Sequence, residues 1–364
     1  MAGESSDDER PRYSRILTDP PRSVVQDGKF VLGCFNGPPE LANMRDVQNP
    51  YHYPVPAWVK DFRCKEWKAF QFGDKRWFFF TALYEGKSFS LTQFSAYDRE
   101  RGRAFETKRI MPLGRFARFG IGDRLDGEKA GYHDRHSSVR YAFDLSGGSV
   151  TVEASCARGA WRKPFAGSFT FAYNSRQTAP SSVCLPLGLN RAMYSTKVLM
   201  PMQGWFEAGG ERFEFGPPDA MGVFDDHKGY YPYTMRYDWV TGFGQDSKGR
   251  RVGFNLTDNQ VRDQELYNEN VLWINSRVFP LPPIKVTRPN GHEKPWHIQD
   301  TEGLVDLTFK PERKNDHKVN MLLAATDYHG PFGSFEGILR SPDGAEKVDA
   351  QGLFGMGEQK YLRA

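Results

Sequence analysis

Side chains suited to acid–base chemistry are concentrated between residues 224 and 239, in the segment FDDHKGYYPYTMRYDW. The segment holds two adjacent acids, a histidine, four tyrosines and a tryptophan. Apolar surroundings raise the pKa of a carboxyl group, which can then donate a proton near neutral pH. Aromatic ring faces can stabilise the positive charge that protonation creates. The composition of this segment predicts either a reaction site or an aromatic strand within a packed core.

Asp225 is the first candidate catalytic residue. Neighbouring side chains of an extended segment point in opposite directions, so we expect at most one of Asp225 and Asp226 to face a pocket. Residues 222–224 have the pattern of a strand end that delivers Asp225 into a loop containing His227. Loops at the mouth of a β scaffold commonly carry function. We therefore choose Asp225 as the residue that faces a pocket.

Glu269 is the second candidate. In YNENVLW (267–273), period-two alternation puts Glu269 between the rings of Tyr267 and Trp273 on one strand face. A buried carboxylate is costly without partners, so Glu269 is expected either in a site or at an exposed strand end. The alternation pattern leaves both placements open.

The strand expected from Tyr233 onwards decides whether these residues surround a cavity. Alternation places Tyr233, Tyr237 and Trp239 on one face. A turn centred on Ser247 would set Asn255 of the returning strand opposite Trp239, which puts an amide among the rings, as in a lined cavity. A slip by one residue would give the rings an apolar partner face instead. The sequence leaves cavity and core both open.

The composition predicts an all-β protein. The chain of 364 residues contains 36 glycines, 24 prolines, 28 phenylalanines, 16 tyrosines and 8 tryptophans, which suits many short strands joined by tight turns. Hairpin turns are expected at residues 85–87, 209–210, 246–249, 275–276 and 342–344. The turn-rich segment 176–191 suggests a seam near Thr196. We expect a disordered tail at 1–20, a first β-barrel-like domain at 21–195 and a second one, carrying the site, at 196–364.

Charge and cysteine usage narrow the functional class. The net charge of +4 is mild for a nucleic-acid binder, so no nucleic-acid partner is expected. The arginine-rich run 99–124 could contact an anionic headgroup at a membrane surface, although solvated strand edges explain it as well. The cysteines lack paired spacing, so we expect reduced thiols in a cytoplasmic protein with no metal site. No cofactor motif, secretory signal or transmembrane segment is apparent.

Several motifs carry a family resemblance. GYYPYTMRYDW, GRRVGFNL, NENVLW and LFGMGEQ, preceded by TKVLMPMQGWFEAGGERFEF, closely resemble the domain of unknown function 2804 family from about VVQDGKFVLG (24–33) to the C-terminus. That family is distantly similar to lipocalin-like proteins of the carotenoid hydratase (hydroxyneurosporene synthase) group, whose two β-barrel-like domains enclose an apolar substrate. The resemblance implies two lipocalin-like (calycin-type) antiparallel β-barrel-like domains rather than an activity.

The chain also departs from the family pattern. His227 stands where glycine is usual, Tyr231 where tryptophan is commoner, Met356 where tryptophan is frequent and Lys360 where histidine is frequent. His227 is therefore a poor candidate for an essential base, and a shared acid–base role of the C-terminal residues is not expected. The pattern itself falls on Lys197, Asp225, Pro232, Tyr233, Trp239, Asn255, Glu269, Asn270 and Glu358.

The hydratase analogy implies cofactor-independent acid–base chemistry, of hydratase or cyclase/isomerase type, on a hydrophobic small molecule. In this hypothesis Asp225 is the acid, Glu269 activates water, and Tyr233 and Trp239 form the pocket walls. Lys197 would hold a polar headgroup. The expected substrate-binding residues are Lys197, Tyr231, Tyr233, Trp239, Asn255, Asn270 and Glu358.

Three alternatives compete with this hypothesis. The same residues could satisfy the ends of a barrel above an aromatic core, as a purely structural set. A barrel could also enclose a lipid or another hydrophobic ligand without transforming it. Paired carboxylates beside aromatic rings also raise the possibility of a glycan-active hydrolase or lyase. Glycosidases need their two carboxyl groups about 5 Å or about 6.5–9.5 Å apart. The placement of Asp225 and Glu269 discriminates among these, because opposed carboxylates across an open cleft favour sugar chemistry.

Overall fold

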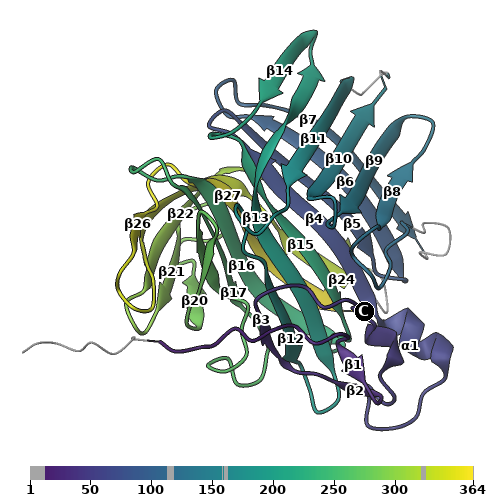
Figure 1. The fold of residues 1–364 in the computed structure, drawn as a ribbon. Helices are drawn as coiled ribbons and strands as arrows, with labels where there is room; N and C mark the ends of the chain where they lie inside the picture. The colour runs from purple at the N-terminus through teal and green to yellow at the C-terminus, as the bar shows by residue number, and fades with distance from the viewer. Residues whose placement is uncertain (1–12, 113–118, 158, 160–162, 321–324, 364) are drawn as a thin grey trace, which may run out of the picture.

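The protein is almost entirely β-structure, as the composition predicts. The structure, a computed structural model, describes residues 13–112, 119–157, 159, 163–320 and 325–363. Two large curled antiparallel sheets make up most of these residues (Figure 1). The other elements in the described ranges are short: a hairpin of β1 and β2, a 3-10 turn and one helix. Their bounds are β1 (Val25–Gln26), β2 (Lys29–Phe30), η1 (Met44–Asp46) and α1 (Ala57–Arg63).

The first sheet has 13 strands among the described residues, in the order β7-β6-β5-β4-β15-β13-β11-β10-β9-β8, with β12 on β13 and β3 and with β14 on β13. Its strands are β3 (Gly33–Phe35), β4 (Lys65–Gly73), β5 (Trp77–Glu85), β6 (Phe89–Asp98), β7 (Arg103–Pro112), β8 (Lys129–His133), β9 (Ser137–Asp144), β10 (Ser149–Cys156), β11 (Phe165–Ala172), β12 (Ser181–Pro186), β13 (Ala192–Ala208), β14 (Glu211–Phe215) and β15 (Met221–Gly229).

The second sheet has 12 strands in the described part of the chain, in the order β19-β18-β17-β16-β27-β25-β22-β21-β20, with β24 on β27, β23 on β24 and β26 on β25. Its strands are β16 (Thr234–Gln245), β17 (Arg251–Asp258), β18 (Val271–Ile274), β19 (Arg277–Pro280), β20 (Ile284–Thr287), β21 (Trp296–Asp300), β22 (Val305–Arg313), β23 (Asp316–Asn320), β24 (Ala325–His329), β25 (Phe332–Arg340), β26 (Lys347–Asp349) and β27 (Phe354–Arg363).

The expected hairpins are confirmed. Turns at 86–88, 209–210, 246–250, 275–276 and 341–346 join β5 to β6, β13 to β14, β16 to β17, β18 to β19 and β25 to β26. Gly209 and Gly210 have φ values of 65° and 81°, a left-handed pair that side chains with a Cβ rarely adopt. The arginine-rich run contributes β7, and its residues 113–118 lie outside the described ranges.

The boundary between the two sheets differs from the expected one at 195/196. Thr196 lies inside β13, a continuous strand that pairs with β15 over Met193–Pro201 and with β11 over Met202–Ala208. β15 also belongs to the first sheet, so the chain passes to the second sheet between β15 and β16. The turn-rich segment 176–191 is not a seam, because it contains the edge strand β12 of the first sheet.

The N-terminal segment is partly built into the fold, whereas a disordered tail was expected at 1–20. Residues 1–12 lie outside the described ranges, but Thr18 forms a bridge with Phe35. Arg15 is 8% exposed and donates hydrogen bonds to the carbonyl oxygens of Asn268 (2.6 Å) and Asn270 (2.5 Å). This guanidinium ties the start of the chain to the segment that precedes β18.

Strand β5 shows how the two sheets share their cores. Its alternate residues Trp77, Phe79 and Leu83 join the core enclosed by the first sheet. The intervening Phe78 and Phe80 join a different cluster that contains residues of both sheets. A strand buried on both faces needs an unbroken apolar run, which explains the sequence WFFFTALY.

The two sheets pack against each other through that mixed cluster. The ring of Phe78 from β5 lies 4.9 Å from Phe332, 5.2 Å from Phe354 and 6.1 Å from Phe243, all from the second sheet. Such aromatic contacts favour one relative placement of the sheets beyond their contribution of buried area. The inter-sheet face is therefore a fixed surface on which side chains from both halves of the chain meet.

Candidate functional site

A cavity of about 120 Å³ continues the inter-sheet cluster. Both sheets contribute to its lining, which includes eight Phe, Tyr and Trp side chains. Among the lining residues are Trp67, Phe80, Tyr84, Phe89, Lys197, Asp225, His227, Tyr231, Tyr237, Trp239, Glu269, His317, Tyr328, Glu358 and Lys360. The volume is close to that of the ~150 Å³ engineered cavities that hold one benzene molecule. It suits one ring or a short branch of a larger ligand.

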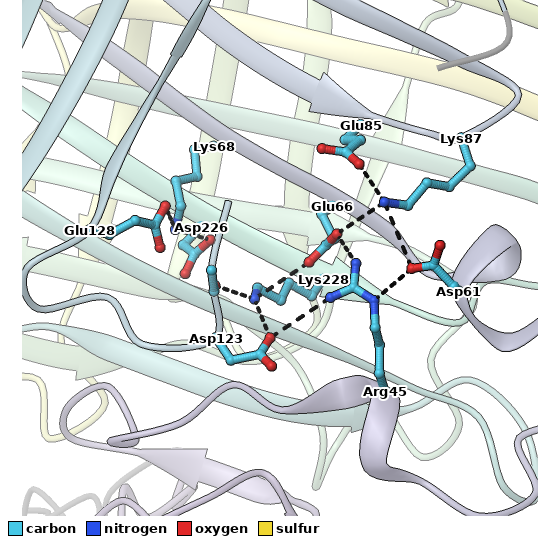
Figure 2. A network of polar contacts seen from close by, with 11 residues as sticks. Arg45, Asp61, Glu66, Lys68, Glu85, Lys87, Asp123, Glu128, Asp226 and Lys228 are labelled. Atoms are coloured by element: carbon cyan, nitrogen blue, oxygen red, sulfur yellow. Dashed lines mark hydrogen bonds and ion pairs between the residues drawn. The ribbon is translucent and has the colours of Figure 1, made fainter. Parts of the chain in front are cut away.

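Strand periodicity selects which of the adjacent acids enters the cavity. Residues 225–229 belong to β15 and not to the expected loop, so successive side chains leave on opposite faces. Asp225 lines the cavity, whereas Asp226 points into the first sheet, where its Oδ1 lies 2.8 Å from Lys68 Nζ. Figure 2 shows Asp226, Lys68 and Glu128 together in this separate polar network.

Lys197 gathers the two candidate carboxylates. Its Nζ lies 2.6 Å from Asp225 Oδ1 and 3.0 Å from Glu269 Oε2, and it donates a 2.9 Å hydrogen bond to Ser195 Oγ. Asp225 comes from β15, Lys197 from β13, and Glu269 from the segment before β18. Burial alone would lower the pKa of Lys197, but the two carboxylates outweigh it and raise the pKa. The three groups carry a net charge of −1.

Glu269 is held as a carboxylate. Its Oε1 accepts a 2.9 Å hydrogen bond from Thr257 Oγ1, and its backbone carbonyl accepts one of 2.9 Å from Asn255 Nδ2. Burial by itself would raise the pKa of Glu269. The ammonium of Lys197, together with the hydrogen bond and charge of His227, instead holds that pKa well below its ordinary value. Glu269 therefore supplies negative charge rather than a proton.

His227 borders this cluster, although the sequence made it a poor candidate for a base. Its Nε2 lies 3.7 Å from Glu269 Oε2, and its Nδ1 shares a 2.6 Å hydrogen bond with the hydroxyl of Tyr231. Its ring stacks on Trp67 with centroids 4.2 Å apart. These contacts fix the imidazole between a carboxylate and a phenol, which is a geometry suited to relaying a proton.

Glu358 and Lys360 form a second polar pair on the cavity side of β27. Burial raises the pKa of Glu358, against the opposing effects of Lys360 and of the hydrogen bonds from Tyr328 and Tyr237. Burial also lowers the pKa of Lys360, against the attraction of Glu358. Both shifts favour the neutral form of the group. The same cavity therefore contains a carboxyl group biased towards protonation and the charged cluster of Lys197, Asp225 and Glu269.

Asn255 and Asn270 lie behind the cavity wall and not on it, in contrast to the expected substrate-binding roles. Asn255 accepts a 2.5 Å hydrogen bond from Trp239 Nε1. Asn270 accepts a 2.7 Å bond from the backbone N–H of Thr257 and donates a 2.8 Å bond to the carbonyl of Pro282. Both amides are fully buried and have protein partners. They position Trp239 and the segment carrying Glu269.

The expected register between β16 and β17 is shifted by two residues. Trp239 pairs with Thr257 and Asn255 pairs with Thr241, because the turn is centred on Lys248 and not on Ser247. A shift of two preserves the face. Asn255 therefore still lies on the same side as Trp239, although not directly opposite it.

Tyr233 was expected as a pocket wall, but the structure places it outside the cavity. Its side chain is 50% exposed and does not line the cavity. Strand β16 begins at Thr234, so the alternation that sets Tyr237 and Trp239 inward does not extend back through the residue that follows Pro232. The preceding Tyr231 lines the cavity instead, with 5% of its surface exposed.

Several residues that line the cavity were not predicted from the sequence. Trp67 and Tyr84 come from the first sheet, and His317 and Tyr328 come from strands late in the chain. No local pattern links these positions to the 224–239 segment. The position of Lys360 could have been predicted, because it lies two residues after Glu358 and so on the same strand face. Its departure from the family pattern argued against a role.

The described part of the chain shows no sign of a metal site or of a membrane-spanning helix. No group of three or more His, Cys, Asp or Glu side chains in the described residues is arranged to hold a metal ion. None of the described helices is long and apolar enough to cross a membrane. All four cysteines are buried free thiols.

Comparison with known proteins identifies a family. The crystal structure of kievitone hydratase from Nectria haematococca is similar at a TM-score of 0.43, with 10% sequence identity over 82% of this chain and 89% of that one. No curated protein matches the sequence. The family model described as domain of unknown function (DUF2804) matches residues 16–363. The chain therefore belongs to the DUF2804 family.

Proposed function

We propose that the cavity binds a small hydrophobic molecule and transforms it by acid–base chemistry of the hydratase or cyclase/isomerase type. One observation carries this proposal: a ring-walled cavity holds Glu358, whose pKa burial raises, together with the Lys197–Asp225–Glu269 cluster of net charge −1. A proton donor and a negative cluster in the same apolar hollow suit a reaction that passes through a cation.

Glu358 takes the role of the acid in this proposal, in place of Asp225. Asp225 is already engaged by the ammonium of Lys197, at 2.6 Å. Glu358 has no ion pair within 4.0 Å among the described residues, and it is 8% exposed. A buried carboxyl group without a counter-ion keeps its proton more readily than a paired one.

The steps follow from these placements. Glu358 donates its proton to a carbon–carbon double bond of the ligand, and the electron pair of that bond forms the new C–H bond. The ring faces of Trp239 and Tyr237 and the net charge of the Lys197 cluster stabilise the cation on the neighbouring carbon. Water adds to that carbon in a hydration, and its surplus proton returns to the Glu358 carboxylate by way of Glu269 or His227, which restores the acid. In a cyclisation or isomerisation the cation instead reacts within the ligand and loses a proton.

Binding without turnover is the second candidate, and one observation favours it. Both Asp225 and Glu269 are engaged by the same ammonium, as expected for a charge cluster that stabilises the cavity floor. The glycan-active alternative is not favoured by the geometry. Carboxylates that share one ammonium lie side by side, whereas sugar hydrolysis needs them on either side of the scissile bond.

Mass spectrometry of small molecules extracted from the purified protein tests the proposal. The recovered ligand is then incubated with the protein and with the variants Glu358→Gln, Asp225→Asn and Glu269→Gln. Glu336→Gln is the matched control, because Glu336 lies in an exposed pair with Lys310. We expect Glu358→Gln to lose ~10²-fold or more in rate, as removal of a general acid does.

Two outcomes discriminate between the candidates. A ligand recovered chemically unchanged after long incubation with the wild-type protein supports the binding protein. Turnover that is unaffected in Glu358→Gln, Asp225→Asn and Glu269→Gln alike would remove these residues from the chemistry. The reducing cytoplasm is the compartment we propose, because the cysteines are free thiols.

A further inference from the structure

Lys360 stands in an aromatic cage without a counter-ion. Its Nζ lies over four rings, at 5.2 Å from the centroid of Tyr84, 5.5 Å from Trp67, 5.7 Å from Tyr237 and 6.0 Å from Tyr328. No described residue forms a hydrogen bond or an ion pair with it. The side chain is half-buried and lines the cavity. The amine is therefore held by ring faces alone and is free to meet a ligand there.

The amine is also reachable from outside. Lys360 lines the cavity and also borders an adjoining polar hollow of about 540 Å³ on the second sheet. Its side chain is part-buried rather than fully enclosed. A ligand that enters through the polar hollow would meet the amine at the point where the apolar cavity begins.

Lys65 provides an internal comparison. Burial lowers the pKa of Lys65 to about 7. Its Nζ is nevertheless occupied, since it donates to the backbone carbonyl oxygens of Phe62 and Gly86. Lys65 lines neither hollow. Of these two lysines with a lowered pKa, Lys360 is the one that faces a ligand site with its amine unbonded.

Glu358 lies where an amine reaction needs an acid. It is two residues before Lys360, on the same face of β27, and both side chains line the cavity. A neutral amine attacks a carbonyl carbon, and an adjacent acid protonates the departing hydroxyl group. Burial favours the neutral form of both groups, as their opposite pKa shifts indicate.

We propose that Lys360 forms a reversible imine with an aldehyde or ketone carbonyl of an aromatic ligand in this cavity. The lone pair of the Lys360 nitrogen forms the C–N bond. The carbonyl oxygen leaves as water, with two protons that replace those lost by the amine, and a C=N double bond to the Lys360 nitrogen remains. A protonated imine retains a positive charge over the surrounding ring faces, where it is stabilised. The inference rests on the proposed function only in using the same cavity as the ligand site.

Reductive trapping with benzaldehyde tests this inference. The full-length protein is incubated with benzaldehyde and sodium cyanoborohydride at pH 7.5, and the cyanoborohydride hydride converts any imine into a stable secondary amine. Peptide mapping by mass spectrometry then locates the adducts. We expect Lys360 to be modified first, ahead of the exposed Lys248 and of the occupied Lys65. Glu358→Gln should slow trapping at Lys360 by roughly 100-fold.

The control variant is Lys360→Met, which keeps an uncharged, unbranched side chain of similar length but has no amine to form an imine. It should leave adducts only on surface lysines, with an unchanged circular dichroism spectrum. Modification of Lys248 as fast as Lys360 in the wild-type protein would overturn the inference. So would equal trapping rates in wild type and Glu358→Gln, because the acid would then have no part.

A calorimetric titration with benzyl alcohol separates this inference from the proposed function. Benzyl alcohol has the same ring but no carbonyl group. Binding of benzyl alcohol without trapping of benzaldehyde at Lys360 would refute the imine and leave the ligand site intact. Absence of both would refute the cavity as a site for small aromatic molecules, and the proposed function with it.

Discussion

Replacement of Lys197 by methionine gives the sharpest test of the charge cluster. The ammonium is buried, at 4% side-chain exposure, and is the only cation within 4.0 Å of Asp225 among the described residues. Its removal leaves the buried carboxylates of Asp225 and Glu269 without the ammonium that both contact. Loss of one partner from a buried ion pair costs about 3–5 kcal/mol in the free energy of unfolding. With an unfolding entropy of about 2.1 cal/mol/K per residue, this corresponds to a Tm lower by roughly 4–7 °C.

The pH dependence of this loss follows from Glu269. In the wild-type protein the pKa of Glu269 lies below the ordinary value of 4.5, so its stabilising contribution is present above pH 4.5 and is lost as pH falls through the native pKa. Without Lys197, burial acts with less opposition and raises that pKa. The variant should then lose stability as pH rises above 4.5. We therefore expect the difference in Tm between variant and wild type to be larger at pH 8 than at pH 5.

Thermal unfolding followed by circular dichroism at pH 5 and pH 8 measures this difference. Lys310→Met is the matched control, because Lys310 pairs with Glu336 at 50% and 38% side-chain exposure. An exposed ion pair contributes only about 0–1 kcal/mol to the free energy of unfolding. Two results would contradict this reasoning: Lys197→Met loses no more stability than Lys310→Met, or it loses the same amount at both pH values. Either would mean that Asp225 and Glu269 are not buried away from water.

Three further predictions concern stability. Burial raises the pKa of Glu128 to about 7, so its ionisation destabilises the protein between pH 4.5 and 7, and Glu128→Gln should gain Tm relative to wild type as pH rises from 5 to 8. Arg15→Met should lower Tm by a few degrees and speed proteolysis of the N-terminal segment, since it removes two charge-assisted hydrogen bonds of roughly 1.5–3 kcal/mol each. Gly222→Ala should cost about 1–3 kcal/mol in urea unfolding, because its Cβ would lie 2.4 Å from Phe72 Cβ, whereas Gly216→Ala meets nothing within 4 Å and should cost less than half as much.

Each of these has a contradicting result. A constant difference between Glu128→Gln and wild type from pH 5 to 8 would mean that this carboxyl group does not titrate as described. Unchanged proteolysis of Arg15→Met would mean that the segment is held by other contacts. Equal costs for the two glycine variants would contradict the close approach of β4 and β15 at Gly222.

Much of the local structure could be predicted from the sequence. Hairpins were predictable because turn residues such as Gly209 and Gly210 adopt left-handed φ values that few other residues tolerate. The opposite directions of Asp225 and Asp226 follow from the period of two of any strand, even though the strand was expected to be a loop. Trp239 and Asn255 lie on the same face of the sheet for the same reason, because a register shift of two residues between β16 and β17 does not change the face.

Which of these residues come into contact could not be predicted, because it depends on the packing of the two sheets. Lys197, Asp225 and Glu269 belong to three segments whose contact depends on how the two sheets pack, and packing leaves no periodic trace in a sequence. The same holds for the cage around Lys360, whose rings come from both sheets. The burial that shifts the pKa of Glu358 and Lys360 is likewise a property of the assembled interface. Alternation is set by the backbone of a single strand, whereas the environment of a side chain is set by residues far away in the chain.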